Sequence, residues 1–145
     1  MDSVKPRGTS YFRLFNMQIV EEFHASGGNV GGQFEDMDLL LLTTTGAKSG
    51  LPREVPLVYF TIDQKMLVAG SFDGNDVDPG WVHNLRVKPR ARINVGMDTY
   101  DVIARELPRW ERDESYPKIV DIEPVFGDFE ARTQRVIPVF ELRRI

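Results

Sequence analysis

The chain has 145 residues, of which 41% are hydrophobic and 28% charged, with a net charge of −4 and no cysteine. This composition fits one ordinary globular domain that can bury a core. It excludes a disulfide framework, a thiolate nucleophile and a cysteine metal site. With only two histidines, His24 and His83, we expect no metal site. The acidic balance argues against general nucleic-acid binding.

Residues 1–10 predict a flexible N-terminal arm, and residues 11–145 a single domain. The start of the chain lacks the apolar segment of a signal peptide. The longest purely apolar run, Leu39–Leu42, is too short to span a bilayer. We therefore expect a cytoplasmic protein and leave a peripheral membrane contact open.

The first predicted helix covers residues 11–24, because apolar side chains recur there every three or four positions. The stripe consists of Phe12, Phe15, Ile19 and Phe23. A serine and two glycines at 26–28 end the helix. We interpret the stripe as core packing rather than as a membrane-surface face.

Six strands and three further helices follow in the sequence. The strands are expected at about 38–45, 53–61, 65–70, 90–97, 100–107 and 135–143. The helices are expected at 79–87, 109–122 and 125–132, the first with Asp78 as N-cap and Pro79 at its first position. Because short turns join most strands, this order predicts an α+β fold, a six-stranded antiparallel split barrel with flanking helices.

The segment 39–53, LLLLTTTGAKSGLPR, predicts an anion-binding loop after a buried strand. Gly46 and Gly50 let the backbone bend so that N–H groups point inward together. The loop adds two cations and a hydroxyl donor: Lys48, Ser49 and Arg53. It is not a Walker A loop, because Ala47 precedes the lysine. A hairpin turn with a solvated lysine is the alternative.

A basic strip is the second charge feature of the sequence. It comprises Arg86, Lys88, Arg90 and Arg92, in a stretch without acids. Such clusters are usually solvated faces. In an acidic protein the strip could also offer a path for an anionic ligand.

Four motifs, in order TTTGAKSG-P-R, VAGS-DG, P-W-NL-P and R-IPV, resemble the deazaflavin-dependent nitroreductase family of actinobacteria. The resemblance runs from about Gly27 to the C-terminus, and the family is similar in fold to flavin-binding split β-barrels. It implies an oxidoreductase that uses F420, a 5-deazaflavin with a phospholactyl group and a polyglutamate tail. Its reduced form would transfer hydride from C5 to a quinone, enone or nitroaromatic acceptor.

The resemblance also implies which residues bind the cofactor. The phosphate and nearby tail would lie on Lys48, Ser49, Gly50 and Arg53. The deazaflavin would be lined by Gly70, Ser71, Asp73 and Gly74, and covered by a helix that presents Pro79, Trp81, Val82, Asn84 and Leu85. For Asn84, a turn-capping role and a hydrogen bond to a ring carbonyl are equally open.

The substrate pocket implied by the resemblance comprises Glu123, Phe126 and Phe129. Tyrosines are found at such positions in the best-known member, so the loss of hydroxyl donors should weaken nitro reduction. No residue is assigned a catalytic role, since hydride transfer needs no protein nucleophile. His83 is interpreted as a surface helix residue.

Two alternatives to an F420-dependent reductase remain open. One is an FMN-binding reductase of the same fold, although FMN is the less favoured cofactor. The other is an F420 carrier with little activity. The expected partners are a small-molecule hydride acceptor and, indirectly, an F420-reducing dehydrogenase, and a homodimer is left open.

Overall fold

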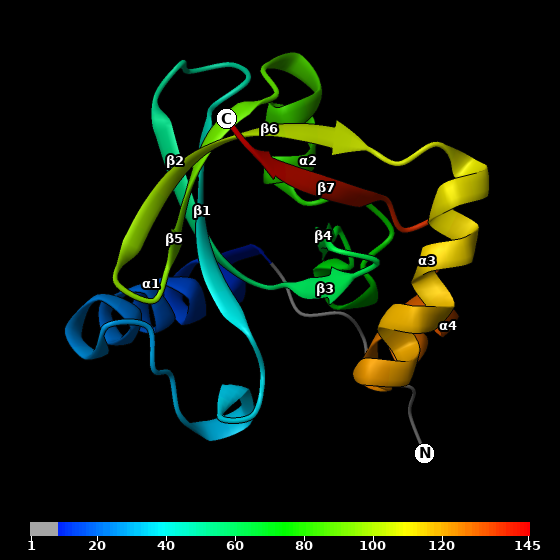
Figure 1. Ribbon diagram of the computed structural model, residues 1–145, viewed down its shortest axis with the longest axis horizontal. Coiled ribbons are helices and arrows are strands. Elements are labelled where there is room, and N and C mark those ends of the chain that lie inside the picture. The colour runs from blue at the N-terminus through cyan, green and yellow to red at the C-terminus, as the bar shows by residue number, and fades with distance from the viewer. Residues whose placement is uncertain (1–8) are drawn as a thin grey trace.

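Seven strands, rather than the six expected, form one antiparallel sheet in the computed structural model, which describes residues 9–145. The strands are β1 (Leu39–Thr45), β2 (Pro52–Val58), β3 (Phe60–Ile62), β4 (Lys65–Ala69), β5 (Arg90–Val95), β6 (Asp98–Glu106) and β7 (Val139–Arg144). Their order in the sheet is β2-β1-β5-β6-β7-β4-β3. The sheet curls into an open barrel (Figure 1), as the α+β barrel prediction requires.

The additional strand arises where one expected strand, 53–61, is divided at Tyr59. Residues before the break pair with β1, whereas those after it pair with β4 at the other edge of the sheet. The Tyr59 amide donates instead to the carbonyl of Asp38, at 2.9 Å. One continuous stretch of chain therefore supplies both edges of the curled sheet.

Helices cover the sheet on two sides and close one end (Figure 1). They are α1 (Thr9–Ser26), α2 (Gly80–Val87), α3 (Arg109–Ile122) and α4 (Val125–Ala131), with short 3₁₀ turns η1 (Gly32–Phe34) and η2 (Phe72–Gly74). The helix α1 begins inside the expected arm 1–10, and the remainder of that arm lies outside the described residues. No helix in the described part of the chain is both long and apolar enough to cross a membrane.

Two expected boundaries were wrong. The helix α2 begins at Gly80 and Pro79 is its N-cap, because Asp78 directs its carboxylate to two arginines instead of capping the helix. The last strand begins at Val139 rather than at residue 135. Pro138 has no N–H for the ladder, and its carbonyl accepts a hydrogen bond from Gly70 at 2.8 Å.

The apolar run of β1 is buried on both faces, which explains why it shows no alternation. Leu40 and Leu42 pack inside the barrel against α2 and strands β4 to β7. Leu39 and Leu41 pack outside, in a cluster with residues of α1. A third cluster joins α3 and α4 to β3, β4 and β7. The strand β1 therefore links α1 to the barrel interior.

An ion-pair cluster fastens α3 to the sheet. Arg105 on β6 donates to both carboxylate oxygens of Glu111, at 3.0 and 2.7 Å, and to Glu141 on β7 at 3.0 Å. Lys65 on β4 lies 3.2 Å from Glu111. Hydrogen bonding by Arg105, helped by Lys65, lowers the pKa of Glu111 from its usual 4.5 to about 2.

Replacing Glu111 with glutamine should lower the free energy of unfolding at neutral pH by about 1 kcal/mol, a small value because Arg105 is partly exposed. Because the pKa of Glu111 is depressed in the folded protein, its contribution is fully present above about pH 4.5 and is lost as the pH falls toward about 2. Urea unfolding should therefore show a difference in unfolding free energy between the native protein and Glu111→Gln that is smaller near pH 3 than at neutral pH. Glu114→Gln, an exposed change on the same helix, is the control; an equal difference at both pH values would contradict the assignment.

Candidate active site

A cavity of about 1120 Å³ opens between α1, β2, the N-terminal end of α2, and α4. This volume suits a cofactor-sized ligand. Its lining comes from segments far apart in the sequence: helix α1, the loop between β1 and β2, the loop around η2, the first turns of α2, and α4. The curl of the sheet brings these segments together.

The loop between β1 and β2 forms the basic end of the cavity. It closes on itself, because the Gly46 amide donates to Leu51 and the Gly50 amide donates to Gly46, at 2.8 and 2.9 Å. Gly50 has φ +71°, a conformation that favours glycine. A Cβ on Gly46 would lie 2.5 Å from the Ser49 hydroxyl and 3.2 Å from the Leu51 carbonyl oxygen, so a larger residue there would displace the Ser49 side chain.

Anion-binding groups converge on this loop. The Ser49 hydroxyl accepts a hydrogen bond from the Leu51 amide at 3.1 Å and lies 3.5 Å from Nη2 of Arg53. Within residues 9–145, the amides of Lys48 and Ser49 donate no hydrogen bond. Lys48, Ser49 and Arg53 are all exposed along the cavity. Two N–H groups that have no acceptor in the described part of the chain, two cations and a hydroxyl therefore lie on one short segment at the cavity, the set of donors that anion sites use.

Asn84 holds the loop in place from inside the barrel. Its Oδ1 accepts from the Ala47 amide at 2.9 Å, and its Nδ2 donates to the Thr44 hydroxyl at 3.0 Å. Both ends of this buried amide are thus used within the protein. Of the two roles left open by the sequence, the structure supports the one of positioning the turn.

The loop around η2 forms the next wall of the cavity. Phe72 and Asp73 line it, and both have positive φ, +46° and +55°. Such backbone costs of the order of 1 kcal/mol per residue and persists only where the surroundings hold it. Asp73 pairs with Arg132 at 3.3 Å. Gly74 is packed tightly, since a Cβ there would lie 2.9 Å from the carbonyl oxygen of Phe129.

Arg135, the arginine of the R-IPV motif, is the main support of this loop, a role that the motif alone did not indicate. Its guanidinium donates to the carbonyls of Asn75 and Ser71, at 2.7 and 2.8 Å, and to Asp78 at 2.9 Å. Its side chain is only 14% exposed. One planar fork of donors thus fixes three points of a single loop.

The helix α2 divides its residues between cavity and core. Trp81 does both, since it lines the cavity and makes an edge-to-face contact with Phe140 at 5.6 Å between ring centroids. Val82 and Leu85 are buried in the barrel interior. His83 is exposed, as expected, but it also lines the cavity.

The other end of the cavity is apolar. Phe126 is buried and meets Phe60 and Phe129 edge to face, at 5.1 and 5.2 Å. Facing residues of α1, among them Phe15 and Ile19, also line the cavity. The core packing expected of the α1 stripe is confirmed for Phe23, which is buried in a cluster that Ile19 packs against. The part that Phe15 and Ile19 play in the cavity wall was missed.

Comparison with known proteins identifies the family. The model of the F420H(2)-dependent quinone reductase family matches residues 16–143. The chain belongs to this family. It is 36% identical over 110 residues to an F420H(2)-dependent quinone reductase of Mycobacterium tuberculosis, a match that covers 72% of each chain. This confirms the expectation of an oxidoreductase that uses reduced F420.

Two solved structures of similar sequence show the same fold. One is an F420-H2 dependent reductase, FDR-A, with 34% identity and a TM-score of 0.65 over 73% of this chain and 94% of that chain. The other, described as a domain-swapped dimer, has 31% identity and a TM-score of 0.67 over 93% and 98%. The split-barrel prediction is therefore confirmed in outline, with seven strands in place of six.

The structure brings most of the expected site residues of this family member to one cavity. Those that line it are Lys48, Ser49, Arg53, Ser71, Asp73, Pro79, Trp81, Asn84, Phe126 and Phe129. Those that do not are Gly50, Gly70, Gly74, Val82, Leu85 and Glu123. The glycines instead shape the walls: a Cβ on Gly70 would lie 2.8 Å from the side chain of Val82.

The basic strip does not reach the cavity of the reductase. Arg86 pairs with Asp78 at 3.0 Å and with Glu106 at 2.8 Å. Arg90 and Arg92 both pair with Asp101, at 3.5 and 3.4 Å. None of the strip residues, Lys88 included, lines the cavity. The strip therefore offers no free positive path to a ligand there.

Proposed function

We propose that F420 binds along the 1120 Å³ cavity with its phosphate at the loop 46–51 and its deazaflavin between η2 and the start of α2. The observation that carries this proposal is the loop's set of donors: the Lys48 and Ser49 amides, which donate no hydrogen bond within residues 9–145, and the Ser49 hydroxyl, which lies 3.5 Å from the Arg53 guanidinium. This donor set suits a phosphate group. The adjoining wall around Trp81 suits a flat ring system.

In this arrangement the protein binds and orients, and the cofactor supplies the chemistry: when bound, reduced F420 donates hydride from its C5. Lys48 and Arg53 offset the phosphate charge. Asn84 fixes the loop that carries them, through its bonds to Ala47 and Thr44. Arg135 fixes the opposite wall. Rigid walls of this kind hold two reactants at a reactive distance and orientation.

We propose a quinone as the acceptor, in preference to a nitroaromatic or an enone. Phe126 and Phe129 give this part of the cavity an apolar wall without hydroxyl donors. Burying a flat, neutral ring there is favourable, whereas a polar nitroimidazole would leave groups without a partner. An F420-reducing dehydrogenase would then return the oxidised cofactor to its reduced form.

Titration of the protein with F420 and with FMN, followed by absorbance, tests the cofactor assignment. We expect F420 to bind more tightly than FMN, and its affinity to fall with added salt because Lys48 and Arg53 are exposed. The protein should also catalyse the oxidation of reduced F420 by a simple benzoquinone. Equal affinity for FMN would contradict the cofactor choice, and tight binding without quinone turnover would favour a carrier.

We also propose a homodimer. Its support is the related structure described as a domain-swapped dimer, which this chain matches over 98% of that chain's length. Light scattering on the purified protein would measure the mass directly, and a monomer at all accessible concentrations would rule the dimer out.

A further inference from the structure

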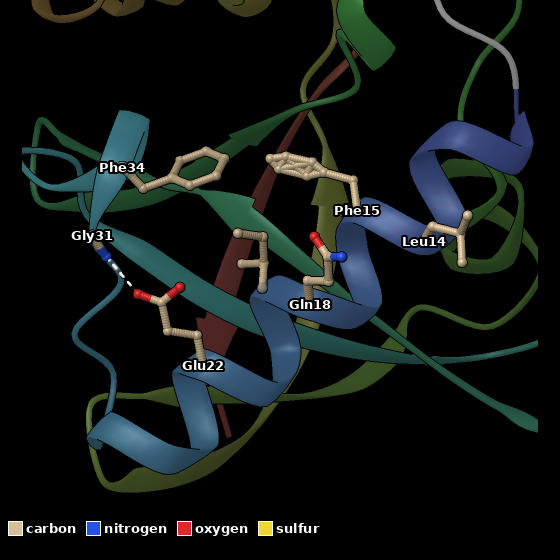
Figure 2. A pocket seen from close by; sticks show the side chains of 8 residues that line it. Leu14, Phe15, Gln18, Glu22, Gly31 and Phe34 are labelled. Carbon is tan, nitrogen blue, oxygen red and sulfur yellow. Dashed lines mark hydrogen bonds between the residues drawn. The ribbon is translucent and has the colours of Figure 1, made fainter.

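A second cavity, of about 600 Å³, adjoins the active-site cavity on the outer side of α1. We call it the outer cavity. Three side chains line both cavities: Phe15, Ile19 and Phe34. Figure 2 shows the rings of Phe15, from α1, and Phe34, from η1, directed toward each other. Their centroids lie 5.9 Å apart, with an interplanar angle of 68°. The two cavities therefore share a wall of side chains.

A hydrogen bond from a backbone amide fixes the frame around this wall. The Glu22 carboxylate accepts a hydrogen bond from the Gly31 amide at 2.7 Å and so ties the loop before η1 to α1 (Figure 2). Phe15 and Phe34 are only half-buried. An edge-to-face pair adds little beyond the burial of its rings. A change of rotamer at either ring can therefore join the cavities without moving the backbone frame.

The two cavities differ in their charged groups. The active-site cavity has the cations Lys48 and Arg53 at its far end, and the acids Glu21, Glu54 and Asp73 also line it. Among the described residues, the one charged group that lines the outer cavity is the acid Glu22. A polyanionic tail is therefore disfavoured in the outer cavity. A neutral apolar chain suits it, because Leu14, Ile19 and the two rings supply an apolar lining.

We propose that the outer cavity receives the aliphatic side chain of the hydride acceptor. The redox-active ring lies in the active-site cavity, and the chain passes between Phe15 and Phe34. This inference rests on the proposed quinone reduction and extends it to a substrate class: neutral quinones that carry an alkyl chain. Phe15 and Phe34 are then residues that determine specificity for the chain, not for the ring.

Gly31 offers a way to fill the outer cavity alone. It lines that cavity and not the active-site cavity. Its φ of −86° accepts any side chain, and the nearest atom to an added Cβ is Oε2 of Glu22, at 3.8 Å. The hydrogen bond to the Glu22 carboxylate survives substitution, because its donor is the backbone amide of residue 31. Gly31→Phe should therefore fill the cavity, and Gly31→Ala is the matched control.

The test compares one benzoquinone without a side chain with the same ring carrying a decyl chain. Binding to the cofactor-free protein is measured by calorimetry, and KM is measured with reduced F420. We expect the decyl compound to be favoured roughly tenfold or more in both, since burying a few methylene groups suffices for that. Gly31→Phe should remove the preference and leave turnover of the unsubstituted ring unchanged, while Gly31→Ala should keep it.

A second variant guards against misfolding of the first. Leu14 is 65% exposed and lines the outer cavity only, so Leu14→Glu should also remove the preference by adding charge there. Equal affinity of the native protein for both quinones would overturn the inference, as would a preference that survives in the folded variants. In those cases turnover of the unsubstituted ring would leave the proposed function standing. A preference in binding without any quinone turnover would contradict the proposed function alone.

Discussion

Replacing Lys48 with alanine should weaken F420 binding by roughly ten- to a hundredfold, and Arg53→Ala should do the same. A charge-assisted hydrogen bond contributes about 1.5–3 kcal/mol, which corresponds to that loss. Both side chains are exposed along the cavity, so the free energy of unfolding should change little. Absorbance titration with F420 measures the first quantity, and urea unfolding measures the second.

Lys88→Ala is the matched control for this experiment, because Lys88 is an exposed lysine at the end of α2 that does not line the cavity. It removes the same charge from the protein as Lys48→Ala. A loss of affinity confined to Lys48 and Arg53 would locate the phosphate at the loop 46–51. Equal losses in all three variants would instead mean that only the total charge matters.

Replacing Arg135 with alanine should lower both stability and F420 affinity. The carbonyls of Ser71 and Asn75 would each lose a charged donor, and Asp78 would lose one of its two arginines, while the Gly74 amide would still donate to Ser71. Losing these charge-assisted hydrogen bonds should cost about 2–4 kcal/mol of unfolding free energy. The loop would also lose the support that holds its positive-φ residues, so F420 should bind at least about tenfold more weakly.

Two further variants separate positioning from bulk stability. Arg135→Lys keeps the charge but not the fork of donors, so it should restore only part of the affinity. Arg132→Ala removes a neighbouring arginine whose bonds to Asp73 are longer, 3.3 and 3.4 Å, and should have a smaller effect. Titrations should be run at a temperature where every variant is folded. Normal F420 affinity of folded Arg135→Ala would reduce this arginine to a structural role.

Local signals in the sequence predicted most of the fold. The helix expected at 109–122 was confirmed at both ends, where its N-cap is Pro108 and its C-cap is Glu123. The division of 53–61 could not be predicted, because the apolar run across Tyr59 continues without a turn signal. The strands β2 and β3 each form a local hairpin, β2 with β1 and β3 with β4. The two hairpins lie at opposite edges of the sheet because β1 pairs with β5 and β4 pairs with β7, and these pairings join segments far apart in the sequence.

The same distinction applies to the site. Residues that share one loop, such as Lys48 and Ser49, could be grouped from the sequence. The wall contributed by α1 could not, because an apolar stripe predicts burial without telling core from cavity. The role of Arg135 was missed, although the R-IPV motif contains it, because its partners lie some sixty positions earlier in the chain. The basic strip is an exposed face, one of the two interpretations that the sequence offered. It offers no path for an anion, because Glu106 and Asp101 become neighbours of its arginines only in the folded protein.

The two ends of the active-site cavity come from different parts of the chain. The loop 46–51 and Arg53 supply the cations, whereas α1 supplies an apolar wall. Substitutions on α1 can therefore reshape the cavity while the loop keeps its geometry. A protein built this way can acquire new electron acceptors by changing one helix, without having to evolve its cofactor site again.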